Sequence, residues 1–359
     1  RDDVESRGLG DVYKRQVLKY TYLGNWETRE DNANIEEKLL TAYLSRRGYT
    51  DKEIRSSIVK LKQSANSLGG GLYNANKEVY TFLRYGVNIQ AEVTEKKKMV
   101  HLIDWANPME NDFQIAEEVT IQGASDRRPD LVVYVNGIAL AVIELKRSTV
   151  SAHEGIRQNI RNQQDGYIPR FFTTIQLLFA GNDTEGLHYG VIKTPEKFWL
   201  RWKEPCGEPC QPSHFTAKEY PNELDRSVLQ FFEPVRLLEY IHDFIIFDGG
   251  IKKTARPNQY FAVKAAQPRV RKKQNGIIWH SQGSGKSLTM VWLAQWIREN
   301  VSDARVVIIT DRDELDKQIE SGFKDVGEQI QRAKSGGKLI EMLNAACLLY
   351  TSDAADDLI

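Results

Sequence analysis

Hydrophobic positions recur with helical spacing along much of the chain. The apolar residues of 32–47 lie three or four positions apart, which predicts a helix that Gly48 ends. Thr50 and Glu53 match a capping box, so a second helix is predicted over residues 50–68. The same spacing predicts further helices over residues 151–164, 222–247 and 286–298.

Shorter apolar runs bounded by turn-forming residues predict strands. These runs are residues 100–103, 113–122, 131–135, 138–145, 175–180 and 189–192. Asn136 and Gly137 separate two of the runs, and this dipeptide is a strong signal for a two-residue hairpin turn. The helices and strands together predict a first domain of α+β class around one sheet.

After residue 255 the order becomes strand, glycine-rich loop, helix, strand and helix, which is the beginning of a parallel α/β domain. The strands are expected at residues 276–279 and 305–310, and the last helix begins at Asp313. The predicted boundaries are 17–205 for the first domain, 206–255 for a loop and helical connector, and 256–346 for the second domain. Residues 1–16 and 347–359 resemble translated sequencing adapters, so we expect non-native tails there.

Overall charge indicates no partner, because 49 basic residues balance 49 acidic ones. Residues 251–273 hold basic side chains and no acidic one, which fits either contact with phosphates or a solvated linker. No apolar run is long enough to span a membrane. Three cysteines are too few for a disulfide framework, so we expect a cytoplasmic protein without a membrane partner.

Cys206, Cys210 and His214 are spaced four apart, which raises the question of a zinc site. A fourth ligand is missing, and proline and glycine surround the three residues. A turn-rich loop is therefore the favoured interpretation.

The segment HSQGSGKS, residues 280–287, has the strand–loop–helix context that a phosphate-binding loop requires. Lys286 would reach the β- and γ-phosphates of a nucleotide, and Ser287 would bind Mg²⁺. His280 stands where the strict motif has glycine. The predicted nucleotide-binding residues are Gly283, Ser284, Gly285, Lys286 and Ser287.

Charged residues close the predicted hairpin at the end opposite its turn. Asp130 precedes the first strand, and Glu144 and Lys146 end the second, two positions apart and so on one face. Two carboxylates at one place favour a divalent cation such as Mg²⁺, with Lys146 orienting water or stabilising charge. The alternative is a salt bridge on a solvated strand end.

The Pro-Asp and Glu-x-Lys pattern resembles nucleases of the PD-(D/E)xK fold. Over about residues 32–329 the chain resembles, in order, the R (restriction and motor) subunit of type I restriction-modification enzymes, through WANPMENDFQIAEEVTIQG, RRPDLVVYVNGIALAVIELKRS, EGIRQNIRNQ and WHSQGSGKSLTM. The resemblance implies metal ligands at Asp130 and Glu144 and a catalytic lysine at Lys146.

In that family a glutamine, with a tyrosine four residues later, supports the nuclease site from the next helix. Gln158 stands at the expected distance, but Asn162 follows it, whereas Gln163 and Tyr167 keep the spacing. Which glutamine supports the site stays open at this point. Glu37 could correspond to an additional acidic residue of related nucleases. The favoured interpretation is an exposed residue on the face of a helix.

The second domain resembles superfamily 2 helicases and translocases. The strand VVIIT and Asp311 to Leu315 match a segment that meets the DNA backbone in such motors. Gln259 matches a glutamine that recognises adenine, or is a solvated helix residue. No Walker B carboxylate and no second lobe are recognisable, so the resemblance implies a truncated RecA-like motor without appreciable ATP turnover.

The resemblance implies a Mg²⁺-dependent endonuclease and ATP-dependent translocase subunit acting on double-stranded DNA. Its partners would be modification and specificity subunits, which bind S-adenosylmethionine and choose the DNA site. A stand-alone nuclease-helicase of repair or phage defence, and a non-catalytic docking module, are the alternatives.

Overall fold

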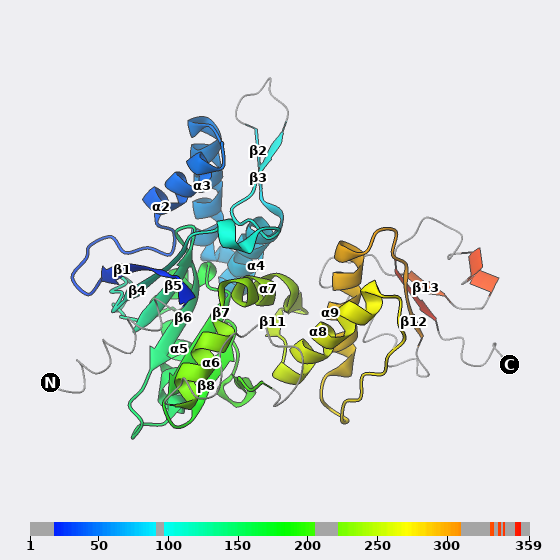
Figure 1. The fold of residues 1–359 in the computed structure, drawn as a ribbon. Coiled ribbons are helices and arrows are strands. Elements are labelled where there is room, and N and C mark those ends of the chain that lie inside the picture. Colours follow the sequence, from blue (N-terminus) through cyan, green and yellow to red (C-terminus); the bar gives the residue numbers. More distant parts are fainter. Residues whose placement is uncertain are drawn as a thin grey trace. The chain divides into compact units, whose positions relative to one another are not determined.

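The computed structural model describes residues 18–90, 97–204 and 222–309, with the short segments 331–333, 337–338, 340–341 and 349–352 (Figure 1). The described residues form two compact units. One comprises residues up to 203 together with 222–242, and the other comprises residue 204 and the residues from 243 onward. Each unit is described separately.

A seven-stranded mixed sheet is the centre of the first unit. Its strands, in spatial order, are β1 (Thr21–Asn25), β4 (Phe113–Glu117), β5 (Leu131–Val135), β6 (Ile138–Leu145), β7 (Leu177–Asn182), β8 (Gly186–Gly190) and β9 (Leu200–Arg201). β1 pairs with β4, and β6 with β7, in parallel, while the other neighbours are antiparallel. The predicted bounds of β5 and β6 are confirmed, whereas β1 and β9 were not predicted.

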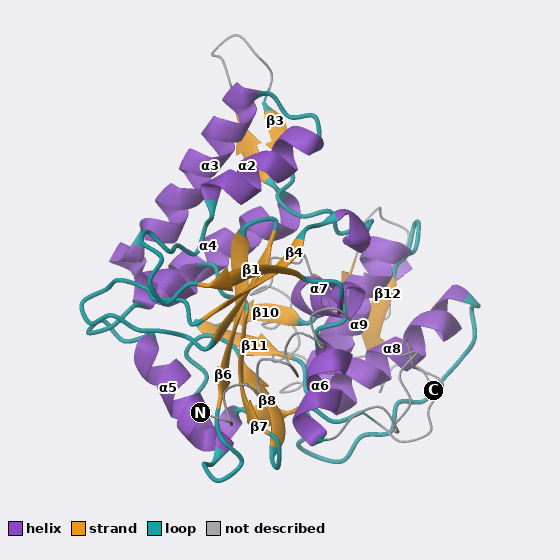
Figure 2. Ribbon diagram, turned by 60° about the vertical axis from the view of Figure 1, so that its left-hand side comes forward, coloured by secondary structure: helices purple, strands orange, loops and turns teal. Residues whose placement is uncertain are grey.

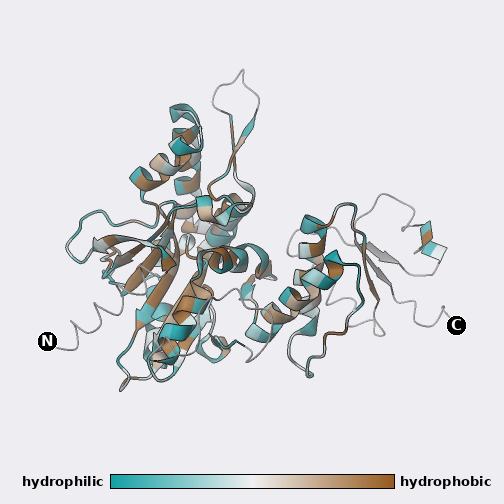
Figure 3. Cartoon of the chain, in the orientation of Figure 1, coloured by the Kyte–Doolittle hydropathy of each residue, from teal (hydrophilic) through white to brown (hydrophobic). Residues whose placement is uncertain are grey.

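Helices cover both faces of this sheet, with α5 (Ala152–Asn162) on one side and α6 (Glu223–Phe231) on the other (Figure 2). Because both faces are covered at the central strands, β5 and β6 are apolar almost throughout instead of alternating (Figure 3). On the α5 side, Val132 and Val142 belong to the same core cluster as Ile156 of the helix. The sheet is therefore a rigid platform.

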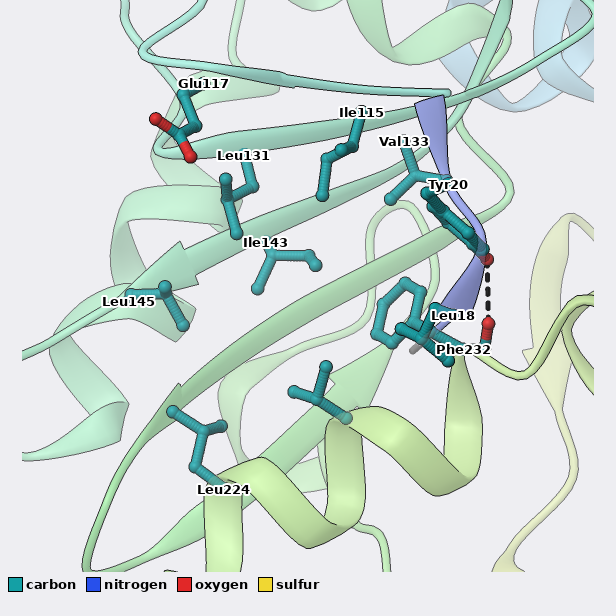
Figure 4. Close-up of a pocket in the computed structure, with 11 residues that line it drawn as sticks. Leu18, Tyr20, Ile115, Glu117, Leu131, Val133, Ile143, Leu145, Leu224 and Phe232 are labelled. Atoms are coloured by element: carbon teal, nitrogen blue, oxygen red, sulfur yellow. Dashed lines mark hydrogen bonds between the residues drawn. The ribbon is translucent and has the colours of Figure 1, made fainter. Parts of the chain in front are cut away.

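The second face carries a small apolar cavity of about 50 Å³ between the sheet and α6 (Figure 4). Leu131 and Ile143 line it from the sheet, and Leu224 lines it from the helix. Beside it the Tyr20 hydroxyl donates a hydrogen bond to the carbonyl of Phe232, at 2.8 Å. This bond ties the beginning of the described chain to the end of α6.

Three helices precede the central strands: α2 (Glu37–Arg46), α3 (Asp51–Asn66) and α4 (Gly71–Tyr85). The capping box of Thr50 and Glu53 at the start of α3 is confirmed. The predicted start of the first helix at residue 32 is wrong, because Asn34 and Ile35 are extended and pair with the start of β6. Helix α4 was not predicted, since the glycines before it interrupt the hydrophobic pattern.

Several shorter elements complete the first unit. β2 (Val87–Ile89) and β3 (Lys98–Val100) form a separate antiparallel pair, so the strand predicted over residues 100–103 begins earlier and ends at its first residue. β4 ends at Glu117, short of residue 122, because Glu118 has a φ of +49°. The 3₁₀ turns are η1 (Leu68–Gly70), η2 (Pro108–Glu110), η3 (Pro169–Thr173) and η4 (Glu196–Phe198).

The single helix predicted over residues 222–247 is wrong. Two helices occur instead, α6 and α7 (Pro234–Asp243), followed by the strand β10 (Ile245–Asp248). Pro234 is the reason for the break, since proline lacks the N–H that would continue α6. β10 pairs with β11 (Ile251–Thr254) in an antiparallel ladder.

The second unit contains α8 (Pro257–Arg271), α9 (Lys286–Asn300) and a parallel sheet in the order β12 (Val306–Ile309), β14 (Leu349–Ser352), β13 (Gln331–Ala333). The predicted strand over residues 276–279 is wrong, because those residues pair with no described strand. Ile277 and Trp279 are 89% and 91% exposed. A strand needs the backbone of a neighbour for its hydrogen bonds, and an apolar run alone does not supply one.

Some predictions fall outside the described residues. These include the helix from Asp313 and the cysteine–histidine group at Cys206, Cys210 and His214. Among the helices that are described, none is both long and apolar enough to cross a membrane.

Candidate active site

The position of Asp130 relative to Glu144 depends on one irregularity in the β5–β6 ladder. At the turn, Val135 pairs with Ile138, but farther along Val133 pairs with Ala141, so Leu140 is an extra residue in β6. Without this bulge the residue opposite Asp130 would be Ile143, and Glu144 would point to the other face of the sheet. With the bulge, the register continues to Asp130 opposite Glu144.

The prediction that strand geometry and the Asn-Gly turn suffice to gather the charges is therefore incomplete. Asn136 and Gly137 do have the positive φ angles of +54° and +79° that such a turn requires. The bulge supplies the remaining one-residue shift. The sequence could have shown that an extra residue is needed. Counting positions along the two predicted strands from a two-residue turn places residues 130 and 144 on opposite faces.

Glu144 is fully buried, with 0% of its side chain exposed. Neither of its carboxylate oxygens accepts a hydrogen bond from any described donor. Burial raises the pKa of Glu144 well above its ordinary value, and the neighbouring Asp130 raises it further, while Lys146 opposes the shift. In the ionised state this carboxylate needs a positive partner that the described side chains provide only partly.

Asp130 is more accessible, with 28% of its side chain exposed. Its Oδ2 accepts a hydrogen bond of 2.6 Å from the backbone N–H of Leu145. This bond fixes the Asp130 carboxylate against the end of β6, beside Glu144.

Lys146 lies between the two acids. Its Nζ is 3.8 Å from Asp130 Oδ2 and 3.9 Å from Glu144 Oε2, and it donates a hydrogen bond of 2.9 Å to Oε1 of Gln158. The structure thus brings together Asp130, Glu144 and Lys146 and, of the two candidate glutamines, Gln158. Gln158 holds the ammonium at a distance from both carboxylates that exceeds a normal hydrogen bond.

Helix α5 carries Gln158 to this place because of its close approach to β6. Ser151 caps the helix by accepting a hydrogen bond from the N–H of His153. A Cβ added at Gly155 would lie 3.2 Å from the carbonyl oxygen of Glu144, so a larger residue would push the helix away. Sequence analysis missed Gly155; the pattern of a glycine in the first turns of a polar helix is its only signal.

The alternative glutamine lies elsewhere. Gln163 is buried, donates to the carbonyl of Asn159 and accepts from the N–H of Lys193. The ring of Tyr167 stacks beneath the guanidinium of Arg127, 4.2 Å from the ring centre. Both residues hold loops together, and of the two glutamines only Gln158 bonds to Lys146 among the described contacts.

Glu37 stands apart from the acidic pair. Its side chain is 53% exposed and forms an ion pair with Lys62 of α3. This is the environment of an exposed helix residue, as the sequence favoured.

The phosphate loop of the second unit leads directly into α9. Gly283 and Gly285 have φ angles of +76° and +85°. A Cβ at Gly285 would lie 2.3 Å from Nε2 of Gln259 and would also be strained by the φ of +85°, so glycine is favoured there. Lys286 is exposed at the first helical position, and its Nζ lies 3.2 Å from the carbonyl oxygen of Ser281.

Gln259 is not solvated, so that alternative is wrong. Its side chain is 2% exposed, and its Nε2 donates hydrogen bonds of 3.2 and 2.8 Å to the carbonyls of Ser284 and Gly285. Its Oε1 accepts from the N–H of Arg256. Gln259 therefore ties α8 to the phosphate loop, while Asp311 to Leu315 lie outside the described residues.

Comparisons with known proteins find matches to parts of both units. Residues 258–352 match the SWI2/SNF2 ATPase family. The type I restriction enzyme MjaIXP endonuclease subunit of Methanocaldococcus jannaschii is described as putative; it is 27% identical, over 93% of this chain and 37% of its own length. The HindI endonuclease subunit of Haemophilus influenzae is 27% identical over 76% of this chain and 27% of its own length. A Staphylococcus aureus endonuclease subunit, SauMSSORF170P, is 25% identical over 70% of this chain and 26% of its own length.

This chain thus spans between about a quarter and about two fifths of the length of these relatives. Residues 13–197, more than half of the chain, match the family described as the N terminus of the type I restriction enzyme R protein. The chain therefore belongs to the type I restriction enzyme R protein family, with a SWI2/SNF2 ATPase region after its N-terminal region.

Proposed function

We propose that the first unit is a PD-(D/E)xK-type endonuclease that hydrolyses phosphodiester bonds of double-stranded DNA. The observation that carries this proposal is the buried carboxylate of Glu144, which lacks a described donor and lies opposite Asp130. The alternative of a solvated salt bridge predicts an exposed Glu144, and its exposure is 0%. A docking module has no use for an uncompensated buried acid.

The donor set fits a hard divalent cation. Mg²⁺ prefers carboxylate oxygens, and the unsatisfied oxygens of Glu144 with the partly exposed carboxylate of Asp130 offer them. These two residues would hold the ion, which when bound would lower the pKa of a water and offset charge on the phosphate.

The protein's own groups supply the rest of the chemistry. Asp130, fixed by the N–H of Leu145, keeps its carboxylate oriented toward the site. Lys146 is held by Gln158, and its ammonium would contact the attacking water and a phosphate oxygen. That positive charge would stabilise the extra negative charge of the transition state. Gln158 is proposed as the positioning residue for Lys146.

For the second unit we propose the beginning of a RecA-like translocase lobe that binds ATP. Gly283 to Ser287 would surround the phosphates at the N-terminus of α9, where backbone N–H groups and the helix dipole favour anions. Lys286 would contact the β- and γ-phosphates, and Ser287 would bind the Mg²⁺ that accompanies ATP. Gln259 would hold the loop in the receptive conformation, with adenine recognition as a further role.

At the level of the whole protein, we propose an ATP-dependent, site-specific deoxyribonuclease that works with modification and specificity subunits in the cytoplasm. The partner subunits would choose the DNA site and bind S-adenosylmethionine. The names of the relatives, which describe endonuclease subunits of type I restriction enzymes, support this proposal.

The test is nicking of supercoiled plasmid by the chain with Mg²⁺ or Mn²⁺, together with calorimetry of the metal binding alone. Asp130→Asn should abolish both nicking and metal binding. Glu37→Gln is the matched control, because it removes an exposed acid outside the pair, and it should change neither. Equal nicking by wild type and Asp130→Asn would reject the nuclease assignment. Site-specific, ATP-dependent cutting by the longer protein without modification and specificity subunits would favour a stand-alone enzyme, whereas unspecific nicking by the chain would not.

A further inference from the structure

We infer that Glu118 is a third acidic residue of the divalent-cation site, and that Arg128 neutralises it when the cation is absent. This inference rests on the proposed nuclease function and adds a residue for which neither the sequence pattern nor the family comparison gives a role. The relevant ligand class is a small divalent cation.

The register of three neighbouring strands aligns Glu118 with Asp130 and Glu144, and these three acids are called the row below. Glu117 of β4 pairs with Leu131 of β5, so the next pair along the ladder is Glu118 and Asp130. The N–H of Glu118 donates a hydrogen bond of 2.9 Å to the carbonyl of Asp130. Since Asp130 in turn lies opposite Glu144, three acids follow one another: Glu118 just after β4, Asp130 just before β5, and Glu144 in β6.

The alternation of side chains puts Asp130 and Glu144 on the same face, and Glu118 lies beside them. Glu117 and Leu131 line the apolar cavity on the α6 side of the sheet (Figure 4). Asp130 follows Leu131 by one residue and therefore belongs to the α5 side, with Glu144. Glu118 follows the end of β4 with a positive φ, so alternation does not fix its side; its carboxylate lies close enough to Asp130 and Glu144 to repel both. The side-chain exposure rises along the row, from 0% at Glu144 to 28% at Asp130 and 37% at Glu118.

The buried end of the row independently points to a ligand. Both oxygens of Glu144 are buried and receive no hydrogen bond from a described donor. Lys146 is the positive charge nearest to Asp130 and Glu144 among the described ion pairs, and Arg128, on Glu118, is shared with Glu27. A cation bound by the row would satisfy the Glu144 oxygens and offset the remaining charge.

The electrostatics of Glu118 agree with this position. Burial raises the pKa of its carboxyl, with Arg128 opposing the shift and Asp130 adding to it. Glu118 also has a positive φ of +49°, an uncommon conformation for a residue other than glycine, asparagine or aspartate. Such backbone strain is found preferentially at functional sites.

Arg128 supplies the counter-charge. Its Nε is 2.8 Å from Oε2 of Glu118, and its guanidinium also pairs with Glu27. Glu27 thus shares the arginine with Glu118 but has no place in the row of acids. The two glutamates form a matched pair of variants, because each removes one ion pair to the same arginine.

The experiment is calorimetric titration of the chain with Mn²⁺, without DNA. Glu118→Gln should weaken binding roughly tenfold or more, as loss of a supporting carboxylate does at metal sites. Glu27→Gln should leave the affinity within about twofold, since an exposed ion pair contributes little. Thermal unfolding of both variants in EDTA verifies that they fold.

The results separate this inference from the function on which it rests. If Asp130→Asn loses binding but Glu118→Gln equals Glu27→Gln, the role of Glu118 is overturned and the nuclease site stands. If Asp130→Asn binds Mn²⁺ like the wild type, the proposed site itself fails. Weaker binding in Glu118→Gln alone supports the third acid.

Discussion

Asp130 and Glu144 lie opposite each other on one face of the sheet because β6 contains Leu140 as an extra residue. The proposed active site therefore depends on the number of residues in β6 as well as on the identity of the acids. Removing one residue from β6 between Ala139 and Ala141 would leave both acids in the sequence and separate them in space.

Deletion of Leu140 is therefore predicted to abolish Mg²⁺ binding and DNA nicking. The alternative outcome, in which the bulge moves along β6 and the acids stay paired, would appear as retained binding and would contradict this prediction. Leu140→Ala is the control, because it shortens the side chain and keeps the count. It should lose stability, by roughly 2–5 kcal/mol for a buried leucine, and keep its metal affinity.

Lys146 and Gln158 are predicted to act on the rate of cleavage more than on metal binding. Lys146→Ala should reduce cleavage about 100-fold or more, since it removes the group placed to stabilise developing charge. Gln158→Ala should have a smaller effect of roughly tenfold, because the lysine remains but loses its acceptor. Single-turnover cleavage at saturating Mg²⁺ measures both.

Tyr167→Phe serves as the control for this series, since the ring that stacks on Arg127 is kept. Its cleavage rate should equal that of the wild type. A loss as large as that of Gln158→Ala would instead assign the supporting role to the Gln163 and Tyr167 pair.

The stability of the metal-free protein is predicted to fall as the pH rises, through Glu144. Its folded-state pKa is raised by burial, so the folded chain binds the proton more tightly than the unfolded chain. This contribution is fully present below the unfolded pKa of about 4.3 and is lost as the pH rises through the folded value. Urea unfolding in EDTA between pH 5 and pH 8 should record this decrease.

Glu144→Gln should remove that dependence, because glutamine stays neutral throughout the range. We expect the variant to be more stable than the wild type at pH 8, with a smaller difference at pH 5. A parallel loss of stability with pH in both proteins would show that another group is responsible.

In the second unit, Gly285→Ala is predicted to abolish binding of a fluorescent ATP analogue. The added Cβ would meet Nε2 of Gln259 at 2.3 Å, and the φ of +85° would be strained as well. Gly283→Ala is the matched control, since its φ is also positive but no atom lies within 4 Å of the added Cβ. It should retain more of the affinity, and the reverse order would contradict the proposed role of Gln259.

Much of the first unit could be predicted from the sequence, because its signals are local. Asn136 and Gly137 fix a hairpin, Thr50 and Glu53 fix a helix start, and both were confirmed. Pattern alone failed where tertiary partners decide the conformation. Asn34 and Ile35 carry a helical stripe but pair with β6, and residues 276–279 carry a strand pattern but lack a described neighbour.

The site itself was only partly visible. Asp130, Glu144 and Lys146 could be recognised by type and spacing, whereas the side-chain environment of Glu144 required the packed sheet. The choice between Gln158 and Gln163 could not be made from spacing, because it depends on which face of α5 approaches Lys146. Glu118 gave no signal at all, since its relation to Asp130 is a cross-strand pairing between distant residues.

The docking of α6 and α7 onto the first unit has a consequence for how such proteins can be recombined during evolution. Tyr20 and Tyr80 donate hydrogen bonds to carbonyls of Phe232 and Ile241, and Phe179 packs on the ring of Phe232. A gene fusion that joined a different motor domain directly after β9 would remove α6 and α7 and expose these aromatic side chains to water. The proposed nuclease module therefore extends to the end of α7, and we expect a join to a new motor to be tolerated only after it.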